Sequence, residues 1–456
     1  MELIAGLRAI LGERGLLLGA DVAARPNRAW GRGSCPALAI VRPADTAELS
    51  AVMALCHQHR QTVVPWGGLT GLVDGITASE HDVVVSLERM QAIERVDPEA
   101  GIMVVQAGAI LEVVQNAATE AGWQFAVDLG GRGSANIGGI ISTNAGGNAV
   151  IRYGMTREQV LGLEVVLADG TVISSMNEML KNNAGYDLKQ LFIGTEGTLG
   201  IVTRAVLRMR PATPEVNTAF LALDEFGDVL ELLKRLQSEL DGRLSAFEVM
   251  WDNHYRMMLE DVGGHQAFLP YGHRYYILVE SSGIDQENGL NQFMTLLESL
   301  MEQGVIKDAV IAQSVQQAAD LWHMRDDVGS LFDVLDPTAI FDVSMPIRRM
   351  EDYISGIESR LKARFPASRL SIFGHLGDGN LHLNFGPAPE SERHDVEEIV
   401  YDELAKVHGS ISAEHGIGLE KRPWLAYSRS KAEIALMQSL KQSLDPAGIL
   451  NPGKIF

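Results

Sequence analysis

The sequence has few cysteines and a deficit of positive charge. Its 456 residues include two cysteines, Cys35 and Cys56. Two thiols cannot build a disulfide framework or a cysteine-ligated zinc site, so we expect a reducing compartment. Lys and Arg number 38 against 59 Asp and Glu, which gives a formal net charge of −21. This acidic surplus opposes binding to nucleic acid and to anionic lipid.

Long apolar runs are missing as well. No run reaches the roughly 18 residues of a membrane-spanning helix, and the opening residues MELIAGLRAILGERG do not have the pattern of a signal peptide. We therefore expect a bacterial cytoplasmic protein. A processed organellar protein would have the same composition, and association with a membrane surface stays open.

Glycine, by contrast, is abundant and clustered. The 46 glycines make up about 10% of the chain, against an average near 7%. Seven of them lie between Asp128 and Gly147, among Ser, Thr and Asn. Another group follows the predicted strand at 63–65, in Trp66–Gly71. There the missing side chains and a positive φ would let backbone N–H groups converge on an anion such as a pyrophosphate. A turn-rich sheet edge is the alternative for this loop alone, but both groups together indicate backbone that lines a large flat ligand.

Two common nucleotide motifs are excluded. No predicted strand is followed by the G-x-G-x-x-G that opens a dinucleotide-binding helix, which argues against a nicotinamide cofactor. The segment from Gly448 to Lys454 imitates a phosphate loop, but Ile455 stands where Ser or Thr would hold magnesium.

The pattern predicts three segments. Residues 1–212 contain short strands (63–65, 82–87, 102–107 and 163–167), an Asp169-Gly170 two-residue hairpin turn, and a helix that begins near Asp45. Residues 213–410 favour a second α+β domain, with helices at 226–240, 287–303, 314–334 and 392–407. Glycine returns in residues 411–456.

Several motifs then resemble one family. Val64–Gly71, Ile141–Gly147 and Gly194–Thr203 are similar to the FAD-binding domain (PCMH type) of the vanillyl-alcohol-oxidase superfamily. Lys181–Gly194, Phe373–His382 and Ser412–Gly418 resemble its D-2-hydroxyacid dehydrogenase branch, which includes D-2-hydroxyglutarate and D-lactate dehydrogenases and the glycolate oxidase D subunit. The resemblance covers nearly the whole chain. It implies an α+β fold in which residues 1–212 and 411–456 form a two-part FAD domain and 213–410 form a cap with an antiparallel sheet.

The resemblance also implies the FAD contacts. Some superfamily members attach FAD through a histidine in the loop after the first strand, where this chain has Leu69, so we expect non-covalent FAD. The expected contacts are Pro65, Gly67, Gly68, Leu69, Thr70, Gly71, Asp128, Gly138, Gly139, Thr143, Asn144, Gly146, Gly147, Gly197, Ile201 and Asn451.

A histidine pair indicates a metal site. An Asp378-Gly379 two-residue turn would pair His375 directly with His382, with Cβ atoms about 5 Å apart on one face of a hairpin. Two opposed imidazoles suit one metal ion, and a structural histidine pair is the alternative. Asn384 shares the face of His382.

The resemblance completes this site. It makes Glu414 the third metal ligand, beside His375 and His382, and His415 the catalytic base and a substrate contact. Two imidazoles and a carboxylate suit Zn²⁺, our first choice, but also Mn²⁺ or Fe²⁺. Asn384 and Arg325 are the other expected substrate contacts. Without the resemblance, Arg325 would be a surface helix charge paired with Asp326 or Asp327.

The substrate and partners are less well defined. D-2-hydroxyglutarate is the first expectation, yet Gly329 and Ile340 replace a threonine and a lysine typical of its dehydrogenases. D-lactate, glycolate or a bulkier monoacid therefore stay open, and Arg348 or Arg349 could replace the missing cation. An electron-transfer flavoprotein or quinone is the expected acceptor, and a homodimer the expected assembly. Two other classes are an ether-lipid synthase-like transferase, against which Glu414 argues, and a non-catalytic flavoprotein subunit.

Overall fold

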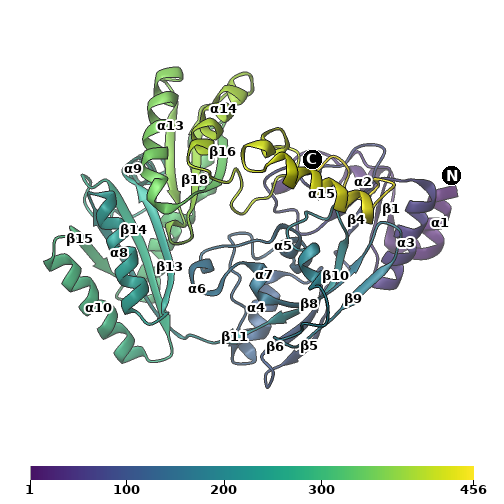
Figure 1. The fold of residues 1–456 in the computed structure, drawn as a ribbon, viewed down its shortest axis with the longest axis horizontal. Coiled ribbons are helices and arrows are strands. Elements are labelled where there is room, and N and C mark those ends of the chain that lie inside the picture. The colour runs from purple at the N-terminus through teal and green to yellow at the C-terminus, as the bar shows by residue number, and fades with distance from the viewer. Residues whose placement is uncertain (1) are drawn as a thin grey trace. The chain divides into compact units, whose positions relative to one another are not determined.

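The computed structural model describes residues 2–456, which fall into two compact units. Unit 1 contains the chain up to Gly147, Tyr153–Ala212 and Glu414–Phe456. Unit 2 contains Asn148–Arg152 and Thr213–Ala413. The chain thus leaves unit 1 after Ala212 and returns to it at Glu414 (Figure 1).

Unit 1 starts with a small four-stranded sheet. Its strands lie in the order β1 (Leu16–Leu17), β2 (Ala39–Val41), β4 (Val83–Ser86) and β3 (Val63–Trp66). The last three are parallel, with α3 (Thr46–His59) carrying the chain from β2 to β3. α1 (Glu2–Leu11) packs against α3, and α2 (Ala20–Ala23) follows β1.

The start of α3 is as the sequence predicts. The Asp45 side chain accepts a hydrogen bond from the Glu48 backbone N–H at 2.8 Å, and the Glu48 carboxylate accepts one from the Ala44 N–H at 2.7 Å. The first bond satisfies an N–H group that the first helical turn leaves unpaired, and the second ties the residue before the N-cap to the helix. The helix then buries Leu49, Val52, Met53 and Cys56.

A second, antiparallel sheet completes unit 1. Its order is β5 (Ile93–Asp97), β6 (Ile102–Gln106), β10 (Ile201–Arg208), β8 (Val160–Val166) and β9 (Val172–Ser175). A separate pair joins β7 (Trp123–Gln124) to β11 (Arg210–Pro211). The helices of this region are α4 (Leu111–Glu120), α5 (Ile137–Thr143), α7 (Thr156–Gln159) and α15 (Lys431–Leu444), while α6 (Val150–Tyr153) lies mostly in the short segment Asn148–Arg152 of unit 2. One apolar core joins α3, α5 and both sheets.

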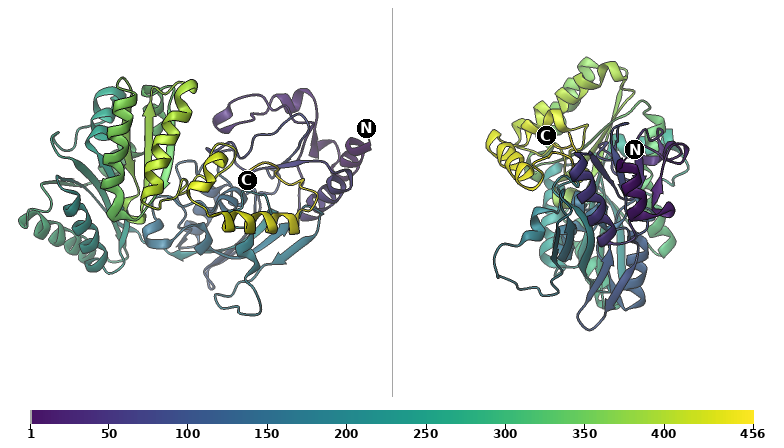
Figure 2. Two further views of the ribbon diagram at one scale, coloured as in Figure 1. Left: turned by 45° about the horizontal axis from the view of Figure 1, so that its top comes forward. Right: turned by 90° about the vertical axis from the view of Figure 1, so that its right-hand side faces the viewer.

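The C-terminal segment is part of unit 1. Leu450 forms a parallel bridge with Val63 of β3. From α15, the Lys441 ammonium donates to the carbonyls of Thr198 and Leu450 and pairs with Asp445 at 2.6 Å. Figure 2 shows this segment, in yellow, returning to the N-terminal part of the chain. The segment Gly448–Lys454, which imitates a phosphate loop, therefore packs on the β3 edge of the small sheet through Leu450.

Unit 2 is built on one seven-stranded antiparallel sheet. The order is β15 (Asp308–Ile311), β12 (Glu215–Leu223), β14 (Tyr275–Gly283), β13 (Leu244–Trp251), β17 (Arg369–Gly374), β18 (Asn380–Gly386) and β16 (Ala339–Ser344). Around it lie α8 (Phe226–Glu239), α9 (Asp252–Met257), α10 (Gln286–Glu302), α11 (Val315–Asp326), α12 (Val328–Val334), α13 (Met350–Arg364) and α14 (Glu390–Lys406). α9, α11 and α12 share an apolar core with the sheet, and α13 lies beside α14 (Figure 1).

One predicted helix is wrong. The helix expected over 314–334 is two helices, because the backbone of Asp327 leaves the helical region, with φ −76° and ψ 55°. Its side chain caps α12 by accepting a hydrogen bond from the Ser330 N–H at 3.3 Å. An N-cap residue has non-helical backbone, so the capping residue divides the run.

Both predicted Asp-Gly turns also differ from expectation. Loop residues 168–170 join β8 to β9, so this turn has three residues rather than two. Between β17 and β18, a 3₁₀ turn at Leu376–Asp378 lengthens the loop, and His382 pairs with Phe373 instead of His375. In each loop the glycine, Gly170 or Gly379, has φ +89° and occupies the last, left-handed position. Three-residue and longer loops favour glycine there as strongly as two-residue turns do.

In the described part of the chain, residues 2–456, no helix has the length and apolar character that a bilayer crossing requires.

Candidate active site

The glycine-rich loops of unit 1 line a pocket of about 220 Å³ that opens to solvent. The loop after β3 contributes Trp66 and Gly67–Leu69, and the segment before α5 contributes Gly133, Ser134 and Asn136. Two glycine groups far apart in the sequence therefore meet at one cavity. Its glycine-rich backbone walls would allow close approach of part of a dinucleotide such as FAD.

Glycine at 67 and 68 permits close approach of the two loops. A Cβ at Gly68 would lie 2.1 Å from the carbonyl oxygen of Ser134, and one at Gly67 would lie 2.8 Å from Asn136 Oδ1. The positive φ, +57°, is found at Leu69. The expectation that these glycines supply left-handed backbone is therefore wrong, because their role is to leave room.

The other expected FAD contacts also lie in unit 1. A Cβ at Gly147 would lie 1.8 Å from the Asp128 carbonyl oxygen, and one at Gly197 would lie 2.6 Å from Pro65 Cγ. Asn451 donates from Nδ2 to the Glu196 carbonyl at 2.7 Å, while its buried Oδ1 has no partner among the described residues. The rest are Thr70, Gly71, Gly138, Gly139, Thr143, Asn144, Gly146 and Ile201.

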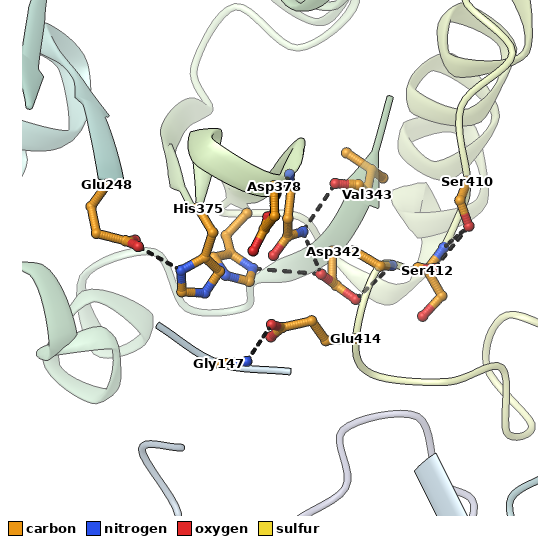
Figure 3. A network of polar contacts seen from close by, with 12 residues as sticks. Gly147, Glu248, Asp342, Val343, His375, Asp378, Ser410, Ser412 and Glu414 are labelled. Atoms are coloured by element: carbon orange, nitrogen blue, oxygen red, sulfur yellow. Dashed lines mark hydrogen bonds and ion pairs between the residues drawn. The ribbon is translucent and has the colours of Figure 1, made fainter. Parts of the chain in front are cut away.

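A buried carboxylate fixes the loop that carries Glu414 and His415. Glu196 accepts hydrogen bonds from the backbone N–H groups of Ile417 and Gly418 at 2.6 and 2.8 Å. Burial raises the pKa of Glu196, although these donors oppose the shift. Glu414 itself accepts a hydrogen bond from the Gly147 N–H at 2.8 Å (Figure 3). The expected flavin loop and the expected base loop are thus joined within unit 1.

In unit 2, His375 and Arg325 share one buried carboxylate. Glu248 Oε1 lies 2.7 Å from His375 Nδ1 (Figure 3), and Glu248 Oε2 lies 2.8 Å from Arg325 Nη2. All three side chains are buried. Burial raises the pKa of Glu248, but His375 and Arg325 outweigh it, and the net pKa lies below its ordinary value. Arg325 also pairs with Asp326 at 3.2 Å, as its helix position alone suggests, but it is buried rather than a surface charge.

His382 has a carboxylate partner of its own. Asp342, directly opposite on β16, places Oδ1 3.8 Å from His382 Nδ1. Asp342 is fixed by the Asn380 amide at 2.8 Å and by the Ala413 N–H at 3.1 Å. Carboxylates that bind one imidazole nitrogen are typical partners of metal-binding histidines, because they orient the other nitrogen toward the ion.

The two imidazoles keep a spacing that suits one metal ion, in spite of the changed register. Their ring centroids are 5.2 Å apart, with the planes at 83°. Two imidazoles bound to a tetrahedral ion at about 2.05 Å would have centroids about 5.2 Å apart. The ring spacing therefore suits a divalent transition metal, which would take the place that Arg325 Nη2 now has 3.2 Å from His375 Nε2.

Asn384 is buried beside this pair, and neither its Oδ1 nor its Nδ2 has a partner among the described residues. A buried amide without partners costs free energy unless a ligand satisfies it. Ile340 lies directly opposite Asn384 in the sheet. Gly329 has open space around its Cα, and Arg348 and Arg349 are exposed.

The sequence reasoning missed Glu248 and Asp342 as site residues. Each is a single carboxylate within an apolar strand, in Leu244–Trp251 and Ala339–Ser344. A charge in such a run must be paired once it is buried, and this is the signal that could have identified both.

Comparison with known proteins gives consistent matches. Residues 37–175 match the family model of an FAD binding domain, and residues 213–455 match that of the C-terminal domain of FAD linked oxidases. The D-2-hydroxyglutarate dehydrogenase of Xanthomonas citri pv. viticola is 40% identical over 94% of this chain and 92% of its own. The mitochondrial D-2-hydroxyglutarate dehydrogenase of Arabidopsis thaliana is 36% identical over 98% of this chain and 80% of its own. A mitochondrial protein of Schizosaccharomyces pombe named for D-lactate dehydrogenase is 36% identical over 91% of this chain and 81% of its own.

Solved structures share the fold at low identity. p-Cresol methylhydroxylase superposes with a TM-score of 0.77 at 16% identity, covering 100% of this chain and 96% of its own. An alkyldihydroxyacetonephosphate synthase superposes with a TM-score of 0.75 at 17% identity, covering 99% and 84%. The expected α+β, PCMH-type flavoprotein fold is thereby confirmed.

Proposed function

The chain belongs to the FAD-linked oxidases of the D-2-hydroxyacid dehydrogenase type, and on that premise we propose that it oxidises a D-2-hydroxy acid to the 2-oxo acid, assisted by a divalent metal. One observation carries the proposal. The ring centroids of His375 and His382 are 5.2 Å apart, and each imidazole lies beside a buried carboxylate. The Asn384 amide, which has no partner among the described residues, is on the same strand as His382.

The glycine loops would hold FAD without a covalent bond, since Leu69 stands at the attachment position. Gly67 and Gly68 line the pocket, and the free Asn451 Oδ1 offers an acceptor for a hydroxyl group of the cofactor. Bound FAD supplies the acceptor for the substrate α-hydride.

His375, His382 and Glu414 would hold the metal. The residue before Glu414, Ala413, donates to the same Asp342 carboxylate that lies beside His382. Zn²⁺ is the first choice, and Mn²⁺ or Fe²⁺ would also suit these donors. The ion would polarise the substrate hydroxyl and lower its pKa.

The remaining residues would position the substrate and take its proton. His415 accepts the hydroxyl proton as the C2 hydrogen leaves as hydride, so the C–O single bond becomes the carbonyl of the 2-oxo acid. Asn384 binds a polar substrate group with its unpartnered amide. Arg325 presents a planar cation to the carboxylate while Glu248 fixes its orientation.

The named relatives favour D-2-hydroxyglutarate as first substrate, with D-lactate or glycolate second. Ile340 weakens the case for a second carboxylate, because an apolar side chain faces Asn384 where a lysine would supply positive charge. We further propose an electron-transfer flavoprotein or quinone as acceptor, a homodimer and a cytoplasmic location.

Anaerobic addition of D-2-hydroxyglutarate, D-lactate and D-malate, of their L enantiomers, and of the achiral glycolate to the FAD-loaded protein tests the function. Bleaching of flavin absorbance by a D acid, and not by its L enantiomer, is expected. An intact spectrum with every acid would refute the dehydrogenase and favour the transferase or the non-catalytic subunit. His415→Asn keeps a similar side-chain size and should lose most bleaching while FAD stays bound. Wild-type bleaching rates in this variant would remove His415 from the role of base.

A further inference from the structure

Unit 2 contains a second cluster of potential metal-binding side chains, separate from His375 and His382. His265, His323 and Asp327 each place one potential ligand atom within 4.8 Å of the others. His323 is on α11, and Asp327 is one turn later, where α11 ends and α12 begins. Residues four apart share one face of a helix, so both side chains point the same way.

His265 reaches this face from a loop. The loop starts with Gly263 and Gly264, whose φ angles of +72° and +78° are in the left-handed region. Side chains at these positions would be strained, although nothing lies within 4 Å of an added Cβ. The backbone is thus bent to bring the next residue back to the protein, and the His265 side chain is only 4% exposed.

The distances suit one ion. His265 Nε2 lies 3.1 Å from Asp327 Oδ2, and the His265 and His323 ring centroids are 5.0 Å apart. Two ligand atoms of a tetrahedral Zn²⁺ with bonds of about 2.05 Å are roughly 3.3 Å apart, and two such imidazoles have centroids about 5.2 Å apart. A hydrogen bond between His265 and Asp327 does not require a second imidazole nearby. A metal ion requires further ligands, and the neighbouring His323 supplies one.

We propose that His265, His323 and Asp327 form a second divalent-metal site, of the class that takes Zn²⁺. The ion takes the place of the proton between His265 and Asp327 and leaves a fourth position for water. Its role is structural, since it fixes the 263–265 loop to the α11–α12 junction. Arg325 lies between the two ligands on the same turn, so the site also stabilises the helix end that carries this arginine.

The test is a count of bound Zn²⁺. Full-length, FAD-loaded protein without an affinity tag is stripped of metal and titrated with Zn²⁺ against a chromophoric chelator. His323→Ala should bind one equivalent fewer than wild type, or bind that equivalent at least tenfold more weakly. His323 is exposed on a helix, so alanine should not disturb folding. His81→Ala, at a highly exposed histidine outside this cluster and outside the proposed active site, is the matched control and should bind as wild type does.

A second variant and a second measurement guard against an indirect effect. Asp327→Asn keeps the N-cap of α12, because Asn caps helices as well as Asp does, but should weaken the same equivalent. Zn²⁺ should raise the melting temperature of wild type more than that of His323→Ala. Equal stoichiometry and affinity in wild type and His323→Ala would overturn the proposal. The comparison is independent of the proposed active-site metal, because His323→Ala leaves His375, His382 and Glu414 in place.

Discussion

Glu248 allows the sharpest test of how the site is built. Its side chain is 0% exposed and binds two partners, His375 at 2.7 Å and Arg325 at 2.8 Å. Replacing it with alanine leaves the buried Arg325 guanidinium without its main counter-charge. Removal of one member of a buried ion pair costs about 3–5 kcal/mol, a large share of a typical unfolding free energy of about 5–15 kcal/mol.

The two charged partners of Glu248 predict how further variants should rank in stability. Glu248→Gln keeps an acceptor oxygen and the size, so it should lose less, about 1.5–3 kcal/mol, the value of a hydrogen bond to a charged group. Glu248→Met combined with Arg325→Met removes both charges and should be less destabilising than Glu248→Ala alone. The same alanine variant should bind Zn²⁺ about 10–100-fold more weakly, because His375 loses the carboxylate that orients its ring.

Urea unfolding followed by circular dichroism, on FAD-loaded protein, measures the stability changes. Asp261→Ala is the matched control in the same unit. Asp261 pairs with Arg369 at 2.7 Å, but the two side chains are 38% and 45% exposed, so its loss should cost less than about 1 kcal/mol. If Glu248→Ala costs no more than Asp261→Ala, or if the double variant is the less stable of the two, Glu248 does not hold the site together as described.

Three further outcomes are expected. Ile340→Lys places a cation opposite Asn384 and should raise kcat/KM for D-2-hydroxyglutarate relative to D-lactate about tenfold or more in steady-state assays. An unchanged ratio would show that position 340 does not determine substrate specificity. Gly68→Ala puts a Cβ 2.1 Å from the Ser134 carbonyl oxygen and should abolish retention of FAD through gel filtration, whereas full flavin content would refute the close approach. Burial raises the pKa of Cys56 to about 12, so the native protein at pH 8 should not react there with a thiol reagent until it is unfolded, and rapid modification in native protein would contradict this burial.

Local chemistry made much of the fold predictable. The Asp45 N-cap defines the start of α3, and alternation or continuous β-branched runs identify β3, β4, β6 and β8. These signals depend only on neighbours in the sequence. The two Asp-Gly turns show the limit of these local signals. Gly170 and Gly379 both adopt the left-handed backbone that the dipeptide predicts, but they do so in loops longer than two residues. Loop length, and with it the strand register, depends on packing around the hairpin.

The candidate site also has a part that local sequence predicts and a part that it does not. His375, His382 and Asn384 stand in one short segment, so the sequence could group them. Glu248 is on a different strand more than a hundred residues earlier, and only the order β13-β17-β18 brings it to His375. Long-range strand order is set by the whole sheet, and no local pattern encodes it.

The rate of flavin reduction with and without metal tests directly whether a metal ion assists oxidation of the D-2-hydroxy acid. FAD-loaded protein is stripped of metal, and half is restored with Zn²⁺. Each sample is mixed anaerobically with D-2-hydroxyglutarate or D-lactate in a stopped-flow spectrophotometer. Rapid bleaching is expected in the restored protein, with a rate more than about 100-fold lower in the stripped protein, because polarisation of the hydroxyl is worth several kcal/mol. Equal rates in the two samples would contradict a metal-assisted D-2-hydroxyacid dehydrogenase.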